Sequence, residues 1–215
     1  MYALSAMLCL FFVSTFARAD SAVPVGIQLE VYVKGAQTST PDVLTAMNRE
    51  LGALMQGAGF HVIWRSTDDS VAAGGVERLV MVELRGLCVP RFSNTSAPLL
   101  SSLPLASSSV ADGRVLPFSW VDCSALNRFL SPVALNQTQA EQDSLYGRSM
   151  ARLLAHELYH VLAQTDDHAP AGIAKARFST ADLLAEHLDF EAYALDRLHP
   201  PARVEIADDT SVAAR

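Results

Sequence analysis

The chain has 215 residues, of which 50% are hydrophobic and 18% are charged, and its formal net charge is −7. This length and apolar content suffice for one domain with its own hydrophobic core. The acidic balance, without a stripe of basic residues, argues against nucleic acids and anionic membrane surfaces as partners.

Residues 1–19 have the features of a secretory signal peptide. An apolar run extends from Ala3 to Phe16, and residues 17–19 read Ala-Arg-Ala, an A-x-A cleavage pattern before Asp20. The run is too short to span a membrane as a helix. An uncleaved N-terminal anchor is the alternative, because the usual basic residues before the run are missing. We therefore expect export to the periplasm or the extracellular space, with no membrane attachment after cleavage.

The first half of the mature chain predicts a strand, a helix and two more strands. Thr40 and Pro41 begin the helix as N-cap and first residue, and Gly57 and Gly59 end it. A strand, a helix and a strand in this order predict a right-handed crossover with parallel strands. The expected strands are residues 25–33, 60–65 and 78–84, with a loop at residues 68–75.

The second half predicts fewer strands. Residues 86–112 are rich in Ser and Pro, which predicts a long surface excursion. Residues 114–121 favour a short strand, which we expect at the edge of the sheet, and residues 125–130 favour a helical turn. A last helix is expected from Asp182 to about Leu198, beginning at Ser179-Thr180. The main domain is expected to span residues 20–201, followed by a disordered acidic tail at residues 202–215.

Two cysteines, Cys88 and Cys123, follow the predicted cleavage site. In an exported protein an isolated pair of cysteines usually forms a disulfide. Neither cysteine lies in a C-x-x-C pattern or close to the histidines in sequence, which disfavours a metal-binding role. The sequence therefore predicts a Cys88–Cys123 disulfide.

The stretch with the clearest chemical meaning is His-Glu-Leu-Tyr-His at residues 156–160, inside a predicted helix at residues 143–164. Positions i and i+4 of a helix lie on one face, so His156 and His160 can share a metal ion. Glu157 can reach a water on that metal without binding the metal itself. This is the H-E-x-x-H arrangement of zinc hydrolases, and we favour it over a satisfied pair of core histidines because buried His and Glu are costly unless paired or metal-bound.

A catalytic zinc site has three protein ligands and an open position for water, so a third ligand must be found. We favour His168, because imidazole is the commonest third ligand in such sites, and place Asp166 next. The full set of candidates is Asp166, Asp167, His168, Glu186, His187 and Glu191.

The order of the predicted elements, ending in the H-E-x-x-H helix, resembles the catalytic domain of zinc-dependent metallopeptidases of the metzincin type. Residues 31–64 and 156–175 also resemble a group of uncharacterised exported bacterial proteins that carry H-E-L-Y-H. The resemblance implies an α/β fold with a twisted mixed sheet, a crossover helix and an active-site helix. In two positions the chain departs from the metzincin pattern: Ala163 stands where the turn glycine is expected, and no Met follows Met150.

The resemblance also implies a function. It assigns His156 and His160 as Zn²⁺ ligands and Glu157 as the general base for hydrolysis of a peptide or protein substrate, most simply as an endopeptidase. The extended substrate is expected to pair with the strand at residues 114–121. The alternatives are a catalytically silent zinc-binding interaction domain and an exported globular protein without metal. The candidate donors to the oxyanion are Tyr159, His187 and Tyr193, and the sequence gives no indication of the oligomeric state.

Overall fold

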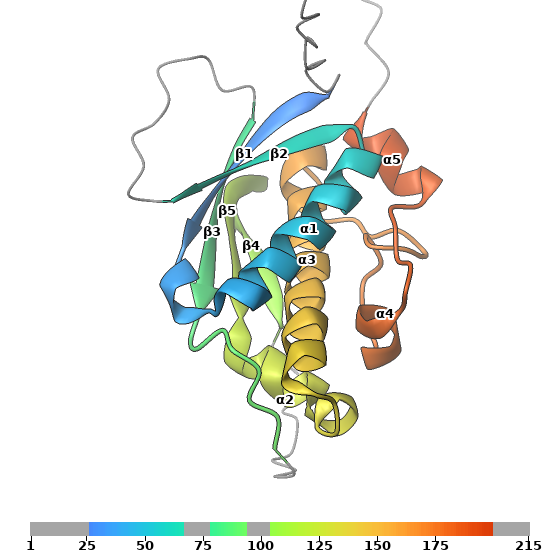
Figure 1. Ribbon diagram of the computed structural model, residues 1–215. Coiled ribbons are helices and arrows are strands. Elements are labelled where there is room, and N and C mark those ends of the chain that lie inside the picture. The colour runs from blue at the N-terminus through green and yellow to red at the C-terminus, as the bar shows by residue number, and fades with distance from the viewer. Residues whose placement is uncertain (1–25, 67–77, 94–103, 200–215) are drawn as a thin grey trace, which may run out of the picture.

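The computed structural model describes residues 26–66, 78–93 and 104–199 (Figure 1). These residues form a mixed α/β fold, in which the two longest helices pack against one face of a five-stranded mixed sheet. The predictions that fall outside the described residues are the signal peptide at residues 1–19, the loop at residues 68–75 and the tail at residues 202–215.

The sheet has the strand order β2-β1-β3-β5-β4. All neighbouring strands are parallel except β4, which runs antiparallel to β5 at one edge. The three strands expected in the first half and their parallel crossover are confirmed. The strands are β1 (Ile27–Lys34), β2 (Phe60–Ser66), β3 (Arg78–Arg85), β4 (Ala106–Ala111) and β5 (Arg114–Asp122).

Five α-helices and one short 3-10 helix are found in the described parts of the chain. The first long helix begins at Pro41 as predicted, where the Thr40 hydroxyl accepts a hydrogen bond from the Val43 N–H. The second begins after Thr138, which forms a capping box with Glu141. The helices are η1 (Ala36–Thr38), α1 (Pro41–Gly57), α2 (Cys123–Ala134), α3 (Gln139–Ala163), α4 (Thr180–Leu184) and α5 (Ala192–Leu198).

Helices α1 and α3 cross in close contact over the sheet (Figure 1). The contact is centred on Gly147 of α3, where an added Cβ would lie 2.4 Å from the Val43 carbonyl oxygen of α1. Only a residue without a side chain allows the two backbones to approach this closely. Leu154 and Leu158 of α3 are fully buried in the same core, which fixes the orientation of the helix that carries the H-E-x-x-H residues.

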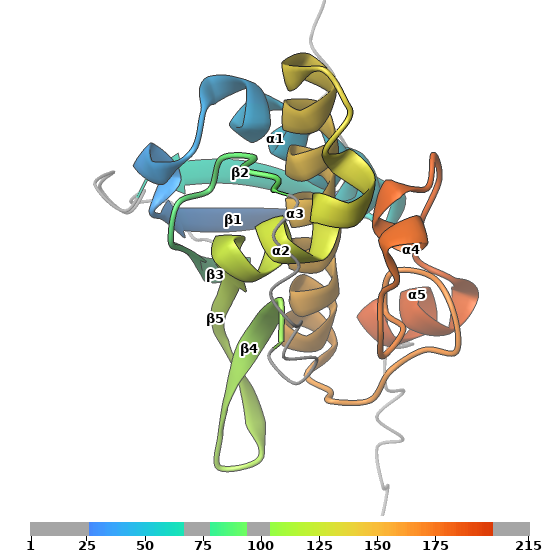
Figure 2. The ribbon, with the colours of Figure 1, turned by 90° about the horizontal axis from the view of Figure 1, so that it is seen from below.

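The expected long excursion at residues 86–112 and the expected edge strand at residues 114–121 both need correction. Residues 106–111 form β4, which covers β5, so β4 and not β5 is the outer strand of the sheet. The two strands are joined by Asp112 and Gly113, both with positive φ, and the hairpin projects from the body of the protein (Figure 2). A two-residue turn of this type is typical of Asp-Gly between antiparallel strands.

The single last helix expected from Asp182 to Leu198 is also wrong, because the segment is divided into α4 and α5. The side chain of Arg152 donates to the carbonyls of Asp182 and Leu183, and Arg148 donates to the carbonyl of Ala185. These carbonyls would otherwise accept hydrogen bonds from the next helical turn. The two arginines of α3 therefore satisfy the carbonyls at the end of α4.

The predicted disulfide is confirmed: Cys88 is bonded to Cys123, with 4.9 Å between their Cα atoms. It joins the segment after β3 to the first residue of α2 and is fully buried. Within the described parts of the chain, no helix combines the length and the apolar character needed to cross a membrane.

Candidate metal centre

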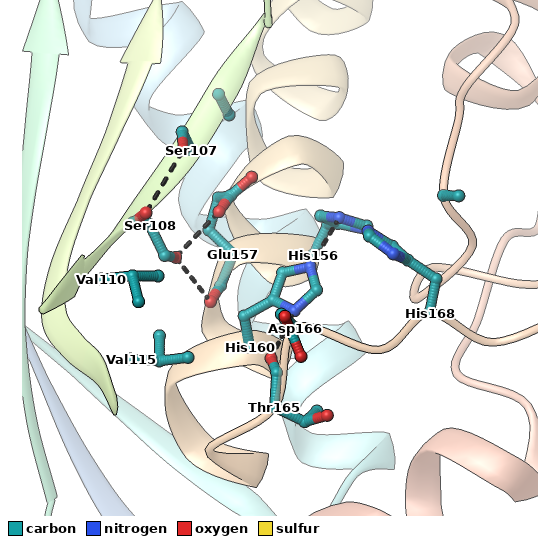
Figure 3. Close-up of a pocket in the computed structure, with 12 residues that line it drawn as sticks. Ser107, Ser108, Val110, Val115, His156, Glu157, His160, Thr165, Asp166 and His168 are labelled. Carbon is teal, nitrogen blue, oxygen red and sulfur yellow. Dashed lines mark hydrogen bonds between the residues drawn. The ribbon is translucent and has the colours of Figure 1, made fainter. Parts of the chain in front are cut away.

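His156 and His160 lie one helical turn apart on the same face of α3, as the sequence predicts (Figure 3). Their rings converge, and the two Nε2 atoms are 3.1 Å apart. His160 is 8% exposed, whereas His156 is partly exposed. The helical spacing alone accounts for this arrangement, since side chains at i and i+4 lie one above the other.

The outer nitrogen of each ring is held by a backbone carbonyl. His156 Nδ1 is 2.8 Å from the Ile173 oxygen, and His160 Nδ1 is 2.7 Å from the Thr165 oxygen. A carbonyl oxygen only accepts hydrogen bonds, so each Nδ1 carries the proton. In the neutral rings both Nε2 atoms are therefore unprotonated, and two lone pairs face each other. In metal sites, backbone carbonyls commonly fix the orientation of the ligand histidines in this way.

Burial keeps both rings neutral. Desolvation lowers the pKa of His156 to about 4, although the hydrogen bond with Ile173 opposes the shift. Desolvation also lowers the pKa of His160, against the opposing hydrogen bond with Thr165. Near neutral pH no proton is available to bridge the facing nitrogens, and a cation between them would remove their repulsion.

His168 completes the group. One nitrogen from each of His156, His160 and His168 can be chosen so that all lie within 4.8 Å of one another. The His168 ring stacks on His156, with 5.2 Å between ring centroids, and meets His160 edge-on at 4.8 Å. His168 is exposed, so it closes the site from the solvent side.

The chain reaches His168 by a turn at Gln164, which has a φ of 50°. This is one residue later than Ala163, the position of the turn glycine in the metzincin pattern. The Gln164 amide donates to the carbonyls of Val115 and Val161, which holds a conformation that glycine normally adopts. After His168, a hydrogen bond from the Ala169 N–H to the Ala174 oxygen closes the loop that presents the Ile173 carbonyl to His156.

The other candidate ligands do not join the three histidines. Asp166 lines the adjoining cavity but is outside the group that can share a metal ion. His187 and Glu186 are 84% and 90% exposed at their side chains, and they lie near each other. Glu191 is the N-cap residue of α5. The described residues thus bring together the three histidines favoured from the sequence.

Glu157 is 5% exposed and lies beside the histidines on α3. Its Oε2 accepts a hydrogen bond of 2.8 Å from the Ser108 hydroxyl of β4 (Figure 3). Burial raises the pKa of Glu157 to about 7, and the hydrogen bonds from Ser108 act in the opposite direction. A carboxyl group with this pKa is suited to exchange protons near neutral pH.

A cavity of about 300 Å³ opens in front of Glu157 and the three histidines. Of the expected oxyanion donors, Tyr159, His187 and Tyr193, none is among the described residues that line it. The lining residues come from the β4–β5 hairpin, α3 and the loop after α3: Ala106, Ser107, Ser108, Val110, Val115, His156, Glu157, His160, Thr165, Asp166, His168 and Ala176.

Ser107 and Ser108 were missed from the sequence because their segment read as a loop. The Asp-Gly pair at residues 112–113 was the available signal, since this dipeptide between two short runs predicts a hairpin. Recognising the hairpin would have placed residues 106–111 beside the predicted strand at 114–121. Their proximity to Glu157 would still have required knowledge of the sheet order.

No protein-family model and no curated protein sequence matches the chain.

Proposed function

We propose that the protein is an exported zinc-dependent metallopeptidase with a metzincin-like H-E-x-x-H site. The observation that carries the proposal is the pair of facing, unprotonated Nε2 atoms of His156 and His160, with Glu157 beside them and His168 within reach. Such a group is unfavourable without a cation and is suited to hold one.

Zinc is the metal that best fits this donor set. Three imidazole nitrogens with an open position facing a cavity are typical of catalytic zinc. The Nε2 atoms of His156 and His160 are 3.1 Å apart, and one nitrogen from each of the three rings can be chosen within 4.8 Å of the others. These three rings would hold a zinc ion between them. When bound, zinc supplies Lewis acidity toward water and a carbonyl group.

Glu157 is the proton carrier in the proposed reaction. It takes a proton from the attacking water and then delivers that proton to the leaving amine, so that the peptide bond is replaced by a carboxylate and an amine. Its burial and its raised pKa, near 7, support this role. His156, His160 and His168 hold the metal, and the carbonyls of Thr165 and Ile173 fix two of the rings.

The outer strand β4 supports a peptide or protein as the substrate. Four residues of β4 line the cavity, and the side of β4 away from β5 has no partner strand among the described residues. An extended peptide can add to such an edge through main-chain hydrogen bonds. We therefore place the extended peptide beside β4, and not beside β5 as expected from the sequence.

The test has a metal arm and a hydrolysis arm. We expect one zinc per chain by elemental analysis of the purified mature protein after zinc reconstitution, and loss of that zinc in His156→Ala. We expect Glu157→Ala to keep the zinc and the fold, but to hydrolyse casein about 100-fold more slowly or worse, the scale of losing general-base catalysis.

The two arms separate the proposal from its alternatives. Zinc binding without hydrolysis of casein or of a peptide library would indicate a silent zinc-binding domain. A zinc content near zero, or one unchanged by His156→Ala, would refute the metal site itself. Full activity in Glu157→Ala would show that Glu157 is not the base.

A further inference from the structure

The hydroxyl groups of two paired serines lead directly to Glu157. Ser108 of β4 and Ser119 of β5 are opposite each other in the antiparallel pair, and their Oγ atoms are 3.0 Å apart. Ser108 Oγ is also 2.8 Å from Oε2 and 3.2 Å from the backbone oxygen of Glu157. Ser119 is 4% exposed, so this contact is protected from water.

Proton counting gives the chain of hydroxyls a direction. The Ser108 hydroxyl has one proton, and an ionised carboxylate and a carbonyl can only accept it. The shorter contact, to Oε2, is charge-assisted when Glu157 is ionised, so Ser108 donates there. The hydroxyl of Ser119 then donates to Ser108. While Glu157 is ionised, the hydrogen bonds therefore run in one direction, from Ser119 to Ser108 and from Ser108 to Glu157.

The two serines lie next to an irregularity in the pairing of β4 and β5. Beyond the Ser108–Ser119 pair the register shifts, and β5 has three residues, 116–118, opposite the single Ser109 of β4. Residue 117 is a proline, which has no N–H to offer the ladder and is tolerated at such an irregularity. Successive side chains of a strand point to opposite faces, so Ser108 contacts Glu157 of α3, whereas Ser109 lines a separate hollow beside Trp120.

We infer that Ser108, supported by Ser119, is a positioning residue that holds Oε2 of Glu157 and leaves Oε1 to exchange the proton with water. The catalytic role of Ser108 rests on the proposed function, whereas the hydrogen bond between Ser108 and Glu157 does not. This hydrogen bond also ties the base to β4, the strand on which we place the substrate.

The first measurement is independent of hydrolysis. Urea unfolding of the full mature chain, at a constant excess of zinc, is compared for wild type, Ser108→Ala, Glu157→Ala and the double variant. We expect Ser108→Ala to lower the unfolding midpoint in the wild-type background and to have a clearly smaller effect when Glu157 is already removed. Ser109→Ala is the matched control and should combine additively with Glu157→Ala. Additive effects of Ser108→Ala and Glu157→Ala would overturn the inference.

The second measurement uses casein hydrolysis. Ser108→Ala should lower kcat by about 10- to 100-fold, the scale for losing an outer-shell partner, with KM nearly unchanged. Ser108→Thr, which keeps a hydroxyl, should recover most of kcat, and Ser109→Ala should behave as wild type. An unchanged kcat in Ser108→Ala would overturn the inference. If the wild type hydrolyses neither casein nor a peptide library, the proposed function fails, and the unfolding cycle alone decides whether Ser108 holds Glu157.

Discussion

At the scale of single residues, His168 is the group whose place in the site depends most on local backbone geometry. It follows the helix by a turn at Gln164 and enters the site from the solvent side. The helix histidines could be paired from sequence because their spacing alone fixes their relation. His168 could be favoured only on ligand chemistry, since the length of a turn after a helix is not set by periodicity.

Replacing His168 separates the two third-ligand candidates. We expect His168→Ala to weaken zinc binding by more than the roughly 10- to 100-fold cost of losing an outer-shell partner, because a direct donor is removed. Asp166→Ala should leave zinc affinity close to wild type, since Asp166 is outside the histidine group. Competition with a chromophoric chelator measures both. Zinc lost in Asp166→Ala and kept in His168→Ala would instead place the third ligand six residues after His160, which is its position in the metzincin pattern.

The contact between Ser108 and Glu157 could not be predicted from the sequence. The two residues are 49 positions apart, and no periodic pattern connects an outer strand to a particular helical residue. The pair exists only because β4 folds over β5 and brings its serines against α3. The three histidines of the candidate site are close in sequence, whereas Glu157 and its partner Ser108 are not.

At the scale of elements, the α1–α3 crossing depends on Gly147. Replacing an interior helical glycine by alanine usually stabilises a helix by up to about 1 kcal/mol. Here the new methyl would lie 2.4 Å from the Val43 carbonyl oxygen. We expect Gly147→Ala to destabilise the protein by about 1–3 kcal/mol, the usual cost of overpacking.

Gly52 of α1 provides the matched control for this prediction. A Cβ at Gly52 meets no atom within 4 Å. Gly52→Ala should therefore be neutral or stabilising by up to about 1 kcal/mol in urea unfolding. Equal behaviour of the two variants would mean that the helix contact at Gly147 is not tight.

The start of α4 carries a titratable contact with a definite pH dependence. Burial raises the pKa of Asp182, but hydrogen bonds from Lys175 and Ser179 outweigh this and lower the pKa to about 2 from 3.8. A lowered pKa means that the folded state holds its proton less tightly than the unfolded state. The resulting stabilisation is present above about pH 4 and is lost as the pH falls toward 2.

Asp182→Asn tests this contact. The variant should be less stable than wild type by about 1 kcal/mol at pH 6, a figure reduced for partial solvent exposure. The difference should shrink as the pH falls from 4 to 2, because the wild-type carboxyl becomes neutral. Unfolding free energies measured across this range would reveal it. A difference that is independent of pH would exclude the ionised carboxylate as its source.

Two elements, β4 and the helix expected from Asp182 to Leu198, show why local sequence patterns did not suffice to predict the secondary structure. The strand β4 is Ala-Ser-Ser-Ser-Val-Ala, a composition without the apolar alternation that marks a half-buried strand. The division of the last helix into α4 and α5 follows from arginines of α3, some thirty residues away. By contrast α1 was predictable from its apolar spacing and its N-cap. The apolar spacing also predicted α3, although this helix begins at Gln139, four residues before the expected start at residue 143.

At the scale of the whole molecule, the Cys88–Cys123 disulfide links the sheet to α2 across 35 residues of chain. We expect the double variant Cys88→Ala/Cys123→Ala to lose about 3–4 kcal/mol of stability through the restored freedom of the unfolded chain. Urea unfolding of the two proteins measures the difference. Mass spectrometry without reduction provides the control, and two free thiols in protein from an oxidising compartment would contradict the bond.

The overall architecture was only partly predictable. The parallel pair β1 and β2 follows from one crossover, whose handedness and length are restricted. The order β2-β1-β3-β5-β4 involves pairings between distant segments, and the sequence offered no pattern that chooses β5 as the neighbour of β3. The sequence therefore gave no indication that β4 lies at the outer edge, beside the candidate site, and only the structure shows it.

The closeness in sequence of His156, His160, His168 and the carbonyls of Thr165 and Ile173 has a consequence for folding. All lie between residues 156 and 173, so the loops that must close to form the metal-binding group are short. Contacts of short range form early, whereas the pairing of β4 with β5 and the approach of Ser108 to Glu157 require distant segments to meet. Closure of the histidine group and the arrangement of Glu157 are thus separable steps, and under the proposed function a chain that is still folding would hold its ion before it could use it.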